Sequence, residues 1–247
     1  MYRIARADPP QSFITFVQKY PAATYDVDLN SDSVLKEELR EHLLRQQGGR
    51  CAYCERDISK SSSTRIEHFH PQSLLVTSAD GECQKRTGVT VRKGGSVAAD
   101  LAIGNLLLCC DGHEGTGEET CDKSKGNTHI CEDMDNPKGL PAEIPSLVEV
   151  KHDGTVEVVR SMRTAADAQR VIDEILNLNS RTLTQNRLRV LSTWKKKFAD
   201  RRKAAGKRST VAVRSALASA LRNAATSSPY PSTLESFARR LEAEVRS

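Results

Sequence analysis

Most of the cysteines in this chain lie in one stretch of its first half, among acidic and histidine side chains. A Cys-x-x-Cys pair, Cys51 and Cys54, opens the stretch, and Cys109, Cys110 and Cys121 follow at a distance. A tight Cys-x-x-Cys turn can present two sulfur atoms to one tetrahedral zinc ion. Redox motifs share this spacing, but a second cysteine group favours metal binding. The pattern therefore predicts a zinc site.

A second set of residues in the same stretch has the chemistry of a hydrolytic site. Residues 65–69 alternate in polarity like a strand, on which Glu67 and His68 would point to opposite faces. A hairpin followed by a helix that begins near Asp122 would bring the three side chains together. Histidine can take a proton from water, and a divalent ion held by carboxylates can stabilise the charge that develops in phosphodiester cleavage. Taken alone, a Glu-His pair is as easily explained as two surface residues.

The preceding sequence contains elements that can position these residues. A short helix is expected over residues 12–17, and a longer helix over residues 31–49, with Ser31 or Ser33 as its N-cap and two glycines at its end. Four leucines fall on one face of the longer helix, so this face is expected to pack in the core and to support the cysteine stretch. The apolar run 106–108 is short enough for a buried strand.

The second half of the chain is expected to be mainly helical after a small hairpin whose turn is Asp153-Gly154. Thr164 is a candidate N-cap for the first helix, and Pro229 and Pro231 separate the last two helices. The expected helices cover residues 164–179, 183 to about 206, 209–225 and 233–247.

Charge is unevenly distributed along the chain. Residues 160–247 contain 19 Lys and Arg against 7 Asp and Glu, a balance of +12, so the remainder carries −7 of the net +5. A basic segment beside an acidic, ligand-rich one suggests a polyanion such as a nucleic acid. The runs 195–197 and 201–203 are candidates for DNA contact, and a solvated helix face explains them equally well.

Composition limits the broad class of protein. With 247 residues, 38% of them hydrophobic and 4% aromatic, the chain allows one large domain or a small domain with extensions. No apolar run approaches the roughly 20 residues that cross a bilayer. The N-terminal residues show no signal-peptide pattern. We therefore expect a cytoplasmic protein without a membrane role.

The motifs CAYC, RIEHFHP, GNLLLCC and CDKSKGN together resemble the HNH endonuclease motif of the ββα-metal type, over about residues 50–127. More narrowly, and with Asn136-Pro137 included, the sequence is similar to the PtuB component of Septu anti-phage systems and its retron-associated relatives. The resemblance implies an α+β fold, in which a ββα-metal core with a structural zinc is flanked by an N-terminal helix and a mainly helical C-terminal region. The corresponding domains are residues 1–49, 50–130 and 131–247.

The resemblance also implies a role for each matched residue. His68 corresponds to the general base and Asn105 to the residue that orients it. Glu67 and Asp122 correspond to ligands of a catalytic Mg²⁺ or Mn²⁺, although Asp and Asn are commoner there. The structural Zn²⁺ ligands correspond to Cys51, Cys54, Cys110 and Cys121.

The identity of one zinc ligand is left open, because residues 111–120 are inserted between the last two cysteines. Cys109 or His113 could therefore replace Cys110. Cys83 has no partner at ligand spacing and is expected to be a free thiol. Among the remaining histidines, surface positions are expected for His42, His129 and His152.

These implications define the expected function. The chain would be a metal-dependent HNH endonuclease acting on DNA, as the nuclease effector of a bacterial anti-phage defence complex. Lys123, Lys125 and His70 are candidate phosphate contacts. The two lysines could instead be solvated, and orienting or packing is the first expectation for His70. No Walker A pattern occurs, so ATP use would need a partner, and the family implies an ABC/SMC-like ATPase, with the C-terminal helices as the docking surface. The alternatives are a non-catalytic zinc-finger adaptor that binds nucleic acid, and a nuclease that cleaves RNA such as tRNA.

Overall fold

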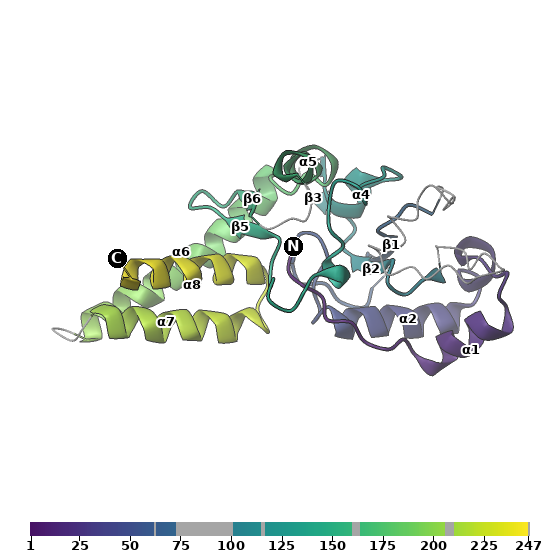
Figure 1. The fold of residues 1–247 in the computed structure, drawn as a ribbon, viewed down its shortest axis with the longest axis horizontal. Helices are drawn as coiled ribbons and strands as arrows, with labels where there is room; N and C mark the ends of the chain where they lie inside the picture. Colours follow the sequence, from purple (N-terminus) through teal and green to yellow (C-terminus); the bar gives the residue numbers. More distant parts are fainter. Residues whose placement is uncertain (62, 73–100, 115–116, 160–163, 206–209, 247) are drawn as a thin grey trace.

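The computed structural model describes residues 1–61, 63–72, 101–114, 117–159, 164–205 and 210–246. The fold combines helices with small two-stranded sheets. The N-terminal helices α1 (Gln11–Lys19) and α2 (Ser33–Gln46) lie at one end of the molecule (Figure 1). The opposite end is formed by α6 (Arg181–Ala205), α7 (Thr210–Ala225) and α8 (Pro231–Arg246).

Short elements connect these two ends. Three antiparallel strand pairs are β1 (Arg65–His68) with β2 (Leu106–Cys109), β3 (His113–Glu114) with β4 (Glu118–Glu119), and β5 (Val148–Val150) with β6 (Val156–Val158). The short helices are α4 (Cys121–Lys125) and α5 (Ala165–Arg170). Single π- or 3₁₀-type turns occur at η1 (Tyr25–Leu29), η4 (Pro137–Gly139) and η5 (Val171–Ile175).

Helix α2 confirms the expected long N-terminal helix but not its expected cap. The N-cap is Asp32, whose side chain accepts a hydrogen bond from the Leu35 amide at 3.0 Å. The prediction of Ser31 or Ser33 is therefore wrong. A carboxylate satisfies a free amide of the first turn as well as a hydroxyl does, and its charge also favours the positive end of the helix dipole.

The end of α2 connects the helix to β2. Gly48 and Gly49 follow with φ angles of 61° and 72°, a left-handed conformation that glycine adopts without strain. Gln47, which precedes them, is buried, and its side-chain amide pairs with Leu108. It donates to the Leu108 carbonyl and accepts from the Leu108 amide, both at 2.7 Å. The helix thereby supports the strand that leads to the cysteine cluster.

Strand β2 confirms the expected buried strand, and both of its faces are covered. Leu107 and Cys109 belong to a large hydrophobic cluster, whereas Leu106 and Leu108 belong to a second cluster with α1 and α2. Alternate residues of a strand point to opposite faces. An uninterrupted apolar run is therefore what a strand between two cores requires.

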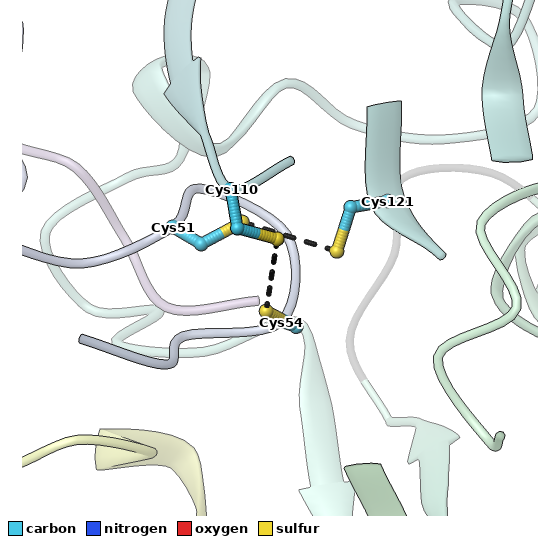
Figure 2. A group of neighbouring side chains, drawn as sticks. All are labelled: Cys51, Cys54, Cys110 and Cys121. Carbon is cyan, nitrogen blue, oxygen red and sulfur yellow. Dashed lines mark hydrogen bonds between the residues drawn. The ribbon is translucent and has the colours of Figure 1, made fainter. Parts of the chain in front are cut away.

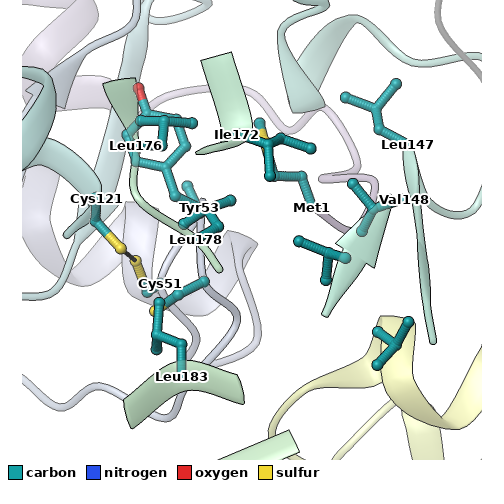
Figure 3. Packing of buried hydrophobic residues seen from close by; sticks show 14 of the residues in the cluster. Met1, Cys51, Tyr53, Cys121, Leu147, Val148, Ile172, Leu176, Leu178 and Leu183 are labelled. Carbon is teal, nitrogen blue, oxygen red and sulfur yellow. Dashed lines mark hydrogen bonds between the residues drawn. The ribbon is translucent and has the colours of Figure 1, made fainter. Parts of the chain in front are cut away.

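The large cluster runs from the cysteines to the C-terminal half of the chain. Figure 3 shows Cys51, Tyr53 and Cys121 packed near Leu176, Leu178 and Leu183, with Val148 of β5 further along. Residues of all three sequence ranges proposed as domains contribute to it, including Met1 and Leu234. The subdivision into domains stays a prediction.

The C-terminal region follows the expected order of elements. The β5–β6 hairpin turns at Gly154, whose φ is 84°. The Thr164 side chain caps α5 by accepting from the Asp167 amide, as expected. The predicted single helix then changes to a π-type turn at η5 and ends near Asn177, whose φ is 47°. Pro231 begins α8 rather than merely breaking the chain, because proline suits the first position of a helix.

No helix in the part of the chain that the structure describes is long and apolar enough to cross a membrane. Cys83, which we expect to be a free thiol, and the whole Gly-, Ser- and charge-rich segment 78–100 around it, which we expect to be a loop, lie outside the described residues.

Candidate metal and active site

Four buried cysteine side chains converge in the centre of the molecule. In Figure 2 the sulfur atoms of Cys51, Cys54, Cys110 and Cys121 point toward one another. All four lie within 4.8 Å of one another, and the Cys51–Cys121 and Cys54–Cys110 pairs are 3.9 Å apart. With Zn–S bonds of about 2.3 Å, a tetrahedral zinc site has sulfur atoms about 3.8 Å apart. The cluster therefore fits a divalent metal ion such as zinc.

The local backbone explains why these four residues meet. Cys51 and Cys54 lie in a tight turn closed by a hydrogen bond from the Glu55 amide to the Cys51 carbonyl at 3.1 Å. Cys110 follows β2 directly. Cys121 begins α4 with a φ of 56°, and its amide donates to the Leu176 carbonyl at 2.8 Å. The fourth cysteine is thus fixed by a contact with the C-terminal region.

Cys110, and neither Cys109 nor His113, lies in the group of four potential metal ligands. His113 is exposed in the β3–β4 hairpin, which holds most of the insertion, and Cys109 lies within β2. Neither belongs to the group of four. Burial raises the pKa of the Cys51 thiol, but hydrogen bonds from neighbouring cysteines outweigh it and hold that pKa well below its usual range. Burial and contacts with neighbouring cysteines instead raise the pKa of Cys54 and that of Cys121 well above the usual range. One thiolate, the form that binds metals, is therefore favoured at Cys51.

A second site lies where β1 meets α4. Glu67 of β1 is buried, and its Oε1 accepts from the Tyr53 hydroxyl at 2.9 Å and pairs with Lys125 Nζ at 2.8 Å. Its carboxyl group also shares a hydrogen bond with Asp122. Burial raises the pKa of Glu67 to about 8, the Asp122 contact adds to the rise, and Lys125 opposes it. A pKa of about 8 means that Glu67 binds a proton at neutral pH when no metal ion is present.

Glu67, His68 and Asp122 line one open cleft of about 320 Å³. Lys123 and Lys125 line it as well. The hairpin and the helix thus bring the three predicted side chains to one place, as the sequence suggested. Two carboxylates facing a polar cleft supply the hard oxygen ligands that Mg²⁺ and Mn²⁺ prefer.

His68 differs from the two carboxylates in its surroundings. Its ring lies edge-on to Tyr25 at 4.7 Å between centroids, next to the N-terminal core rather than Tyr53 and Lys125. Among the described residues, His68 forms no close group of three ligand atoms with Glu67 and Asp122. The arrangement suits a proton acceptor at the cleft better than a third metal ligand.

Asn105 is fully buried and fixes the chain just beyond β1. Its Oδ1 accepts from the His70 amide at 2.6 Å, and its Nδ2 donates to the His70 carbonyl at 3.0 Å. Its own carbonyl accepts from the Phe69 amide at 3.0 Å. Asn105 therefore holds both backbone groups of a residue that lies two positions after His68. This geometry gives it a positioning role, and its catalytic importance stays a prediction.

The three candidate phosphate contacts differ in their surroundings. Lys125 is neither solvated nor free, because it is buried and engaged by Glu67 and by the His68 carbonyl at 3.1 Å. His70 is buried against Cys131 and His129. Lys123 is partly exposed and pairs with Glu119 at 3.7 Å. Lys123 thus matches an exposed position and His70 a packing position, and nucleic-acid contact by any of the three stays a prediction.

Sequence reasoning missed several residues around the site. Tyr53 lies inside the Cys-x-x-Cys turn, and an aromatic residue there was the available signal. Lys138 is buried and donates to the Ile103 and Leu106 carbonyls at 3.0 and 2.6 Å, which flank Asn105. His42, expected at the surface, is buried. None of these three has a motif spacing that would mark it.

Comparison with known proteins gives a distant relationship. No protein-family model matches the chain. A stretch of 137 residues is 28% identical to the "Retron Ec83 putative HNH endonuclease" of Escherichia coli. The match covers 51% of this chain and 46% of that protein, so the chain spans about half the length of the curated relative it matches.

Proposed function

We propose that this chain is a metal-dependent HNH endonuclease that hydrolyses phosphodiester bonds. The observation that carries the proposal is the convergence of Glu67, His68 and Asp122 on one polar cleft. Two further observations support it. The four-cysteine cluster lies beside the same elements, since Cys110 follows β2 and Cys121 begins α4, and the chain has a distant HNH relative. We also propose that β1, β2 and α4 form the ββα-metal core, because the cleft lies between the strand pair and the helix.

In the proposed reaction each residue has one task. His68 takes a proton from the attacking water, which a neutral imidazole can do near pH 7. Asn105 holds the backbone after β1 so that His68 keeps its orientation. Glu67 and Asp122 would hold a Mg²⁺ or Mn²⁺ ion, which stabilises negative charge on the phosphate when bound. The four cysteines take no part in the chemistry, and a zinc ion there contributes folding free energy.

The proposed substrate is DNA, and the proposed setting is an anti-phage defence complex of the Septu or retron type. Support comes from the sequence resemblance to PtuB-like nucleases and from the retron name of the relative. The partner proposed from that resemblance is an ABC/SMC-like ATPase. The second half of α6 is exposed and basic, with Lys195, Lys196 and Arg201 among its solvent-facing residues. This surface suits DNA or an acidic partner.

Cleavage assays with purified full-length protein test the nuclease proposal. Wild type, His68→Ala and His152→Ala are incubated with plasmid DNA and with RNA under Mg²⁺ or Mn²⁺, with and without the ATPase of the same system. His152 is the matched control because it is exposed on the β5–β6 hairpin. We expect nicked DNA with wild type and His152→Ala and no product with His68→Ala, which should stay folded and retain zinc.

Other outcomes would select a different function. Binding of DNA without metal-dependent cleavage by any preparation would favour the zinc-finger adaptor. Cleavage of RNA but not DNA would favour the RNA nuclease. Cleavage by His68→Ala at the wild-type rate would remove His68 from the mechanism.

The partner surface is tested by point substitution. Helices α7 and α8 contribute Leu217, Leu221 and Leu234 to the main core, so removing them would damage the fold. Charge reversal by Lys196→Glu and Arg201→Glu changes only exposed residues of α6. We expect loss of DNA or ATPase binding with unchanged thermal stability. Unchanged binding of both would exclude this face.

A further inference from the structure

Three potential metal ligands outside the site described above lie together behind β1. They are His70, just after the strand, and His129 and Cys131, which follow α4. One ligand atom from each lies within 4.8 Å of the others. His70 and Cys131 are only 2% and 1% exposed, and His129 is half-buried. The three side chains therefore form a compact and mostly buried set of nitrogen and sulfur donor atoms.

The spacing within this cluster fits one tetrahedral ion. Cys131 Sγ lies 3.6 Å from His70 Nδ1. Zinc bonds of about 2.05 Å to nitrogen and 2.3 Å to sulfur give a nitrogen–sulfur separation of about 3.6 Å at the tetrahedral angle. The His70 and His129 rings lie at 80° to each other with centroids 5.0 Å apart, so the rings are not stacked face to face. One nitrogen atom of each ring lies within 4.8 Å of the other and of the Cys131 sulfur, close enough for one ion to bridge them.

We propose that His70, His129 and Cys131 bind a second metal ion, with Zn²⁺ as the ion that this donor set favours. Imidazole nitrogen and thiolate sulfur are both zinc ligands, and three protein ligands leave a fourth position for water or another group. Two imidazoles with one thiolate also suit copper, so the metal content must be measured for both ions. None of the three residues belongs to the four-cysteine cluster. The second ion would thus bind independently of the first.

The site would have a structural consequence for the chain beside His68. The backbone of His70 is already held by Asn105, and Cys131 donates to the Phe69 carbonyl at 3.7 Å. A metal bond to the His70 ring would add a side-chain restraint to these backbone restraints. The segment after β1 would then be tied to the loop after α4 as well as to β2.

Without a metal, the same three residues would be held by weak contacts. The Cys131 thiol would donate to Phe69 or to the His70 ring, and the histidine rings would pack edge to face. This alternative predicts no metal at the cluster, so metal content separates the two. Neither outcome depends on whether the protein cleaves nucleic acid.

Zinc content of the full-length protein tests the proposal. Protein from cells grown with added zinc is passed over a chelating resin, and zinc and copper per chain are measured by plasma mass spectrometry. We expect two zinc ions for wild type and one for Cys131→Ser and for His129→Gln. Cys109→Ala is the matched control, because Cys109 is a buried cysteine outside both clusters, and it should retain two.

Cobalt spectra give a second readout that identifies the ligands. With Co²⁺ in place of zinc, wild type should show sulfur-to-cobalt charge transfer from five thiolates, and Cys131→Ser from four. The His129→Gln variant changes a half-buried residue, so it keeps the test open if Cys131→Ser does not fold. A single zinc ion in wild type, or wild-type zinc content in both variants, would overturn the proposal.

Discussion

Lys125 Nζ lies 2.8 Å from Glu67 Oε1, with side chains only 1% and 6% exposed. Asp122 also contacts the Glu67 carboxyl group. Lys125 lowers the pKa of Glu67 and so opposes the rise that burial and Asp122 cause. A buried charge is tolerated only when it is paired in this way. Lys125, a candidate phosphate contact, therefore stabilises Glu67, the predicted metal ligand.

Replacing Lys125 should reveal this coupling in stability. At pH 9, where Glu67 is ionised, Lys125→Met leaves the Glu67 carboxylate without its cation, and loss of one partner of a buried pair costs about 3–5 kcal/mol. Adding Glu67→Gln to this variant removes the unpaired acid. The destabilisation of the double variant should therefore be about 1–3 kcal/mol smaller than the sum of the destabilisations of the two single variants. Urea unfolding of the four proteins measures the coupling. Additive single effects, within about 0.5 kcal/mol, would show that the two side chains act independently.

Cleavage should depend on pH through Glu67. Its pKa of about 8 means that below pH 8 a proton occupies the carboxyl group that would bind the metal. Cleavage at limiting Mg²⁺ should therefore rise from pH 6 to pH 9, by up to roughly tenfold per unit below pH 8. Raising the Mg²⁺ concentration should move the rise to lower pH, because metal and proton compete. A profile that does not respond to Mg²⁺ would place the titration on another group.

Stability of the metal-free protein should respond to Glu67 in the opposite direction. The folded pKa lies above the ordinary value of 4.5, so the fold binds the proton more tightly than the unfolded chain does. This contribution to the free energy of unfolding is complete below pH 4.5 and is lost as the pH rises to about 8. Gaining activity and losing metal-free stability over the same pH range would distinguish Glu67 from His68.

Local patterns predicted the elements and the cysteine cluster but not the contacts that join them. The leucine face of α2, the apolar run of β2 and the turn at Gly154 each follow from residues within one segment. The burial of Lys125 depends on Glu67, which lies 58 residues earlier. The cap at Asp32 was missed because three neighbouring residues could all serve. Contacts between distant segments leave no periodic signal in either segment.

Asn105 should be required for a correctly placed His68. Asn105→Ala leaves the buried amide and carbonyl of His70 without their partners, which costs about 1–3 kcal/mol for each group. A shift of about 1 Å in His68 would lower kcat on the order of 10²-fold. Asn105→Asp keeps the acceptor and loses the donor, so its loss of stability should be intermediate. Asn223→Ala, on an exposed face of α7, is the control and should leave both quantities unchanged.

The fourth ligand of the cysteine cluster can be identified by substitution. Cys110→Ala should not hold zinc at the four-cysteine cluster and should show no cooperative thermal unfolding, because a structural zinc contributes about 10 kcal/mol or more to folding. Cys109→Ala and His113→Ala should both retain the ion, since neither residue belongs to the cluster. Zinc analysis and circular dichroism measure the two effects. Loss of the ion in Cys109→Ala with retention in Cys110→Ala would reverse the assignment.

Lys138 should make stability rise with pH above neutrality. Burial lowers its pKa from 10.5 to about 7, so between these values the unfolded chain binds a proton that the fold does not. The free energy of unfolding therefore increases as the pH rises through this range.

Lys138→Met removes this titration while retaining an apolar chain of similar length. The difference in the free energy of unfolding between wild type and the variant should shift in favour of wild type by about 2 kcal/mol from pH 6.5 to pH 9. Urea unfolding of zinc-loaded protein at both pH values measures it, and the common contribution of Glu67 cancels in the difference. Parallel pH dependence of the two proteins would mean that Lys138 remains charged, with its ammonium group held by the Ile103 and Leu106 carbonyls.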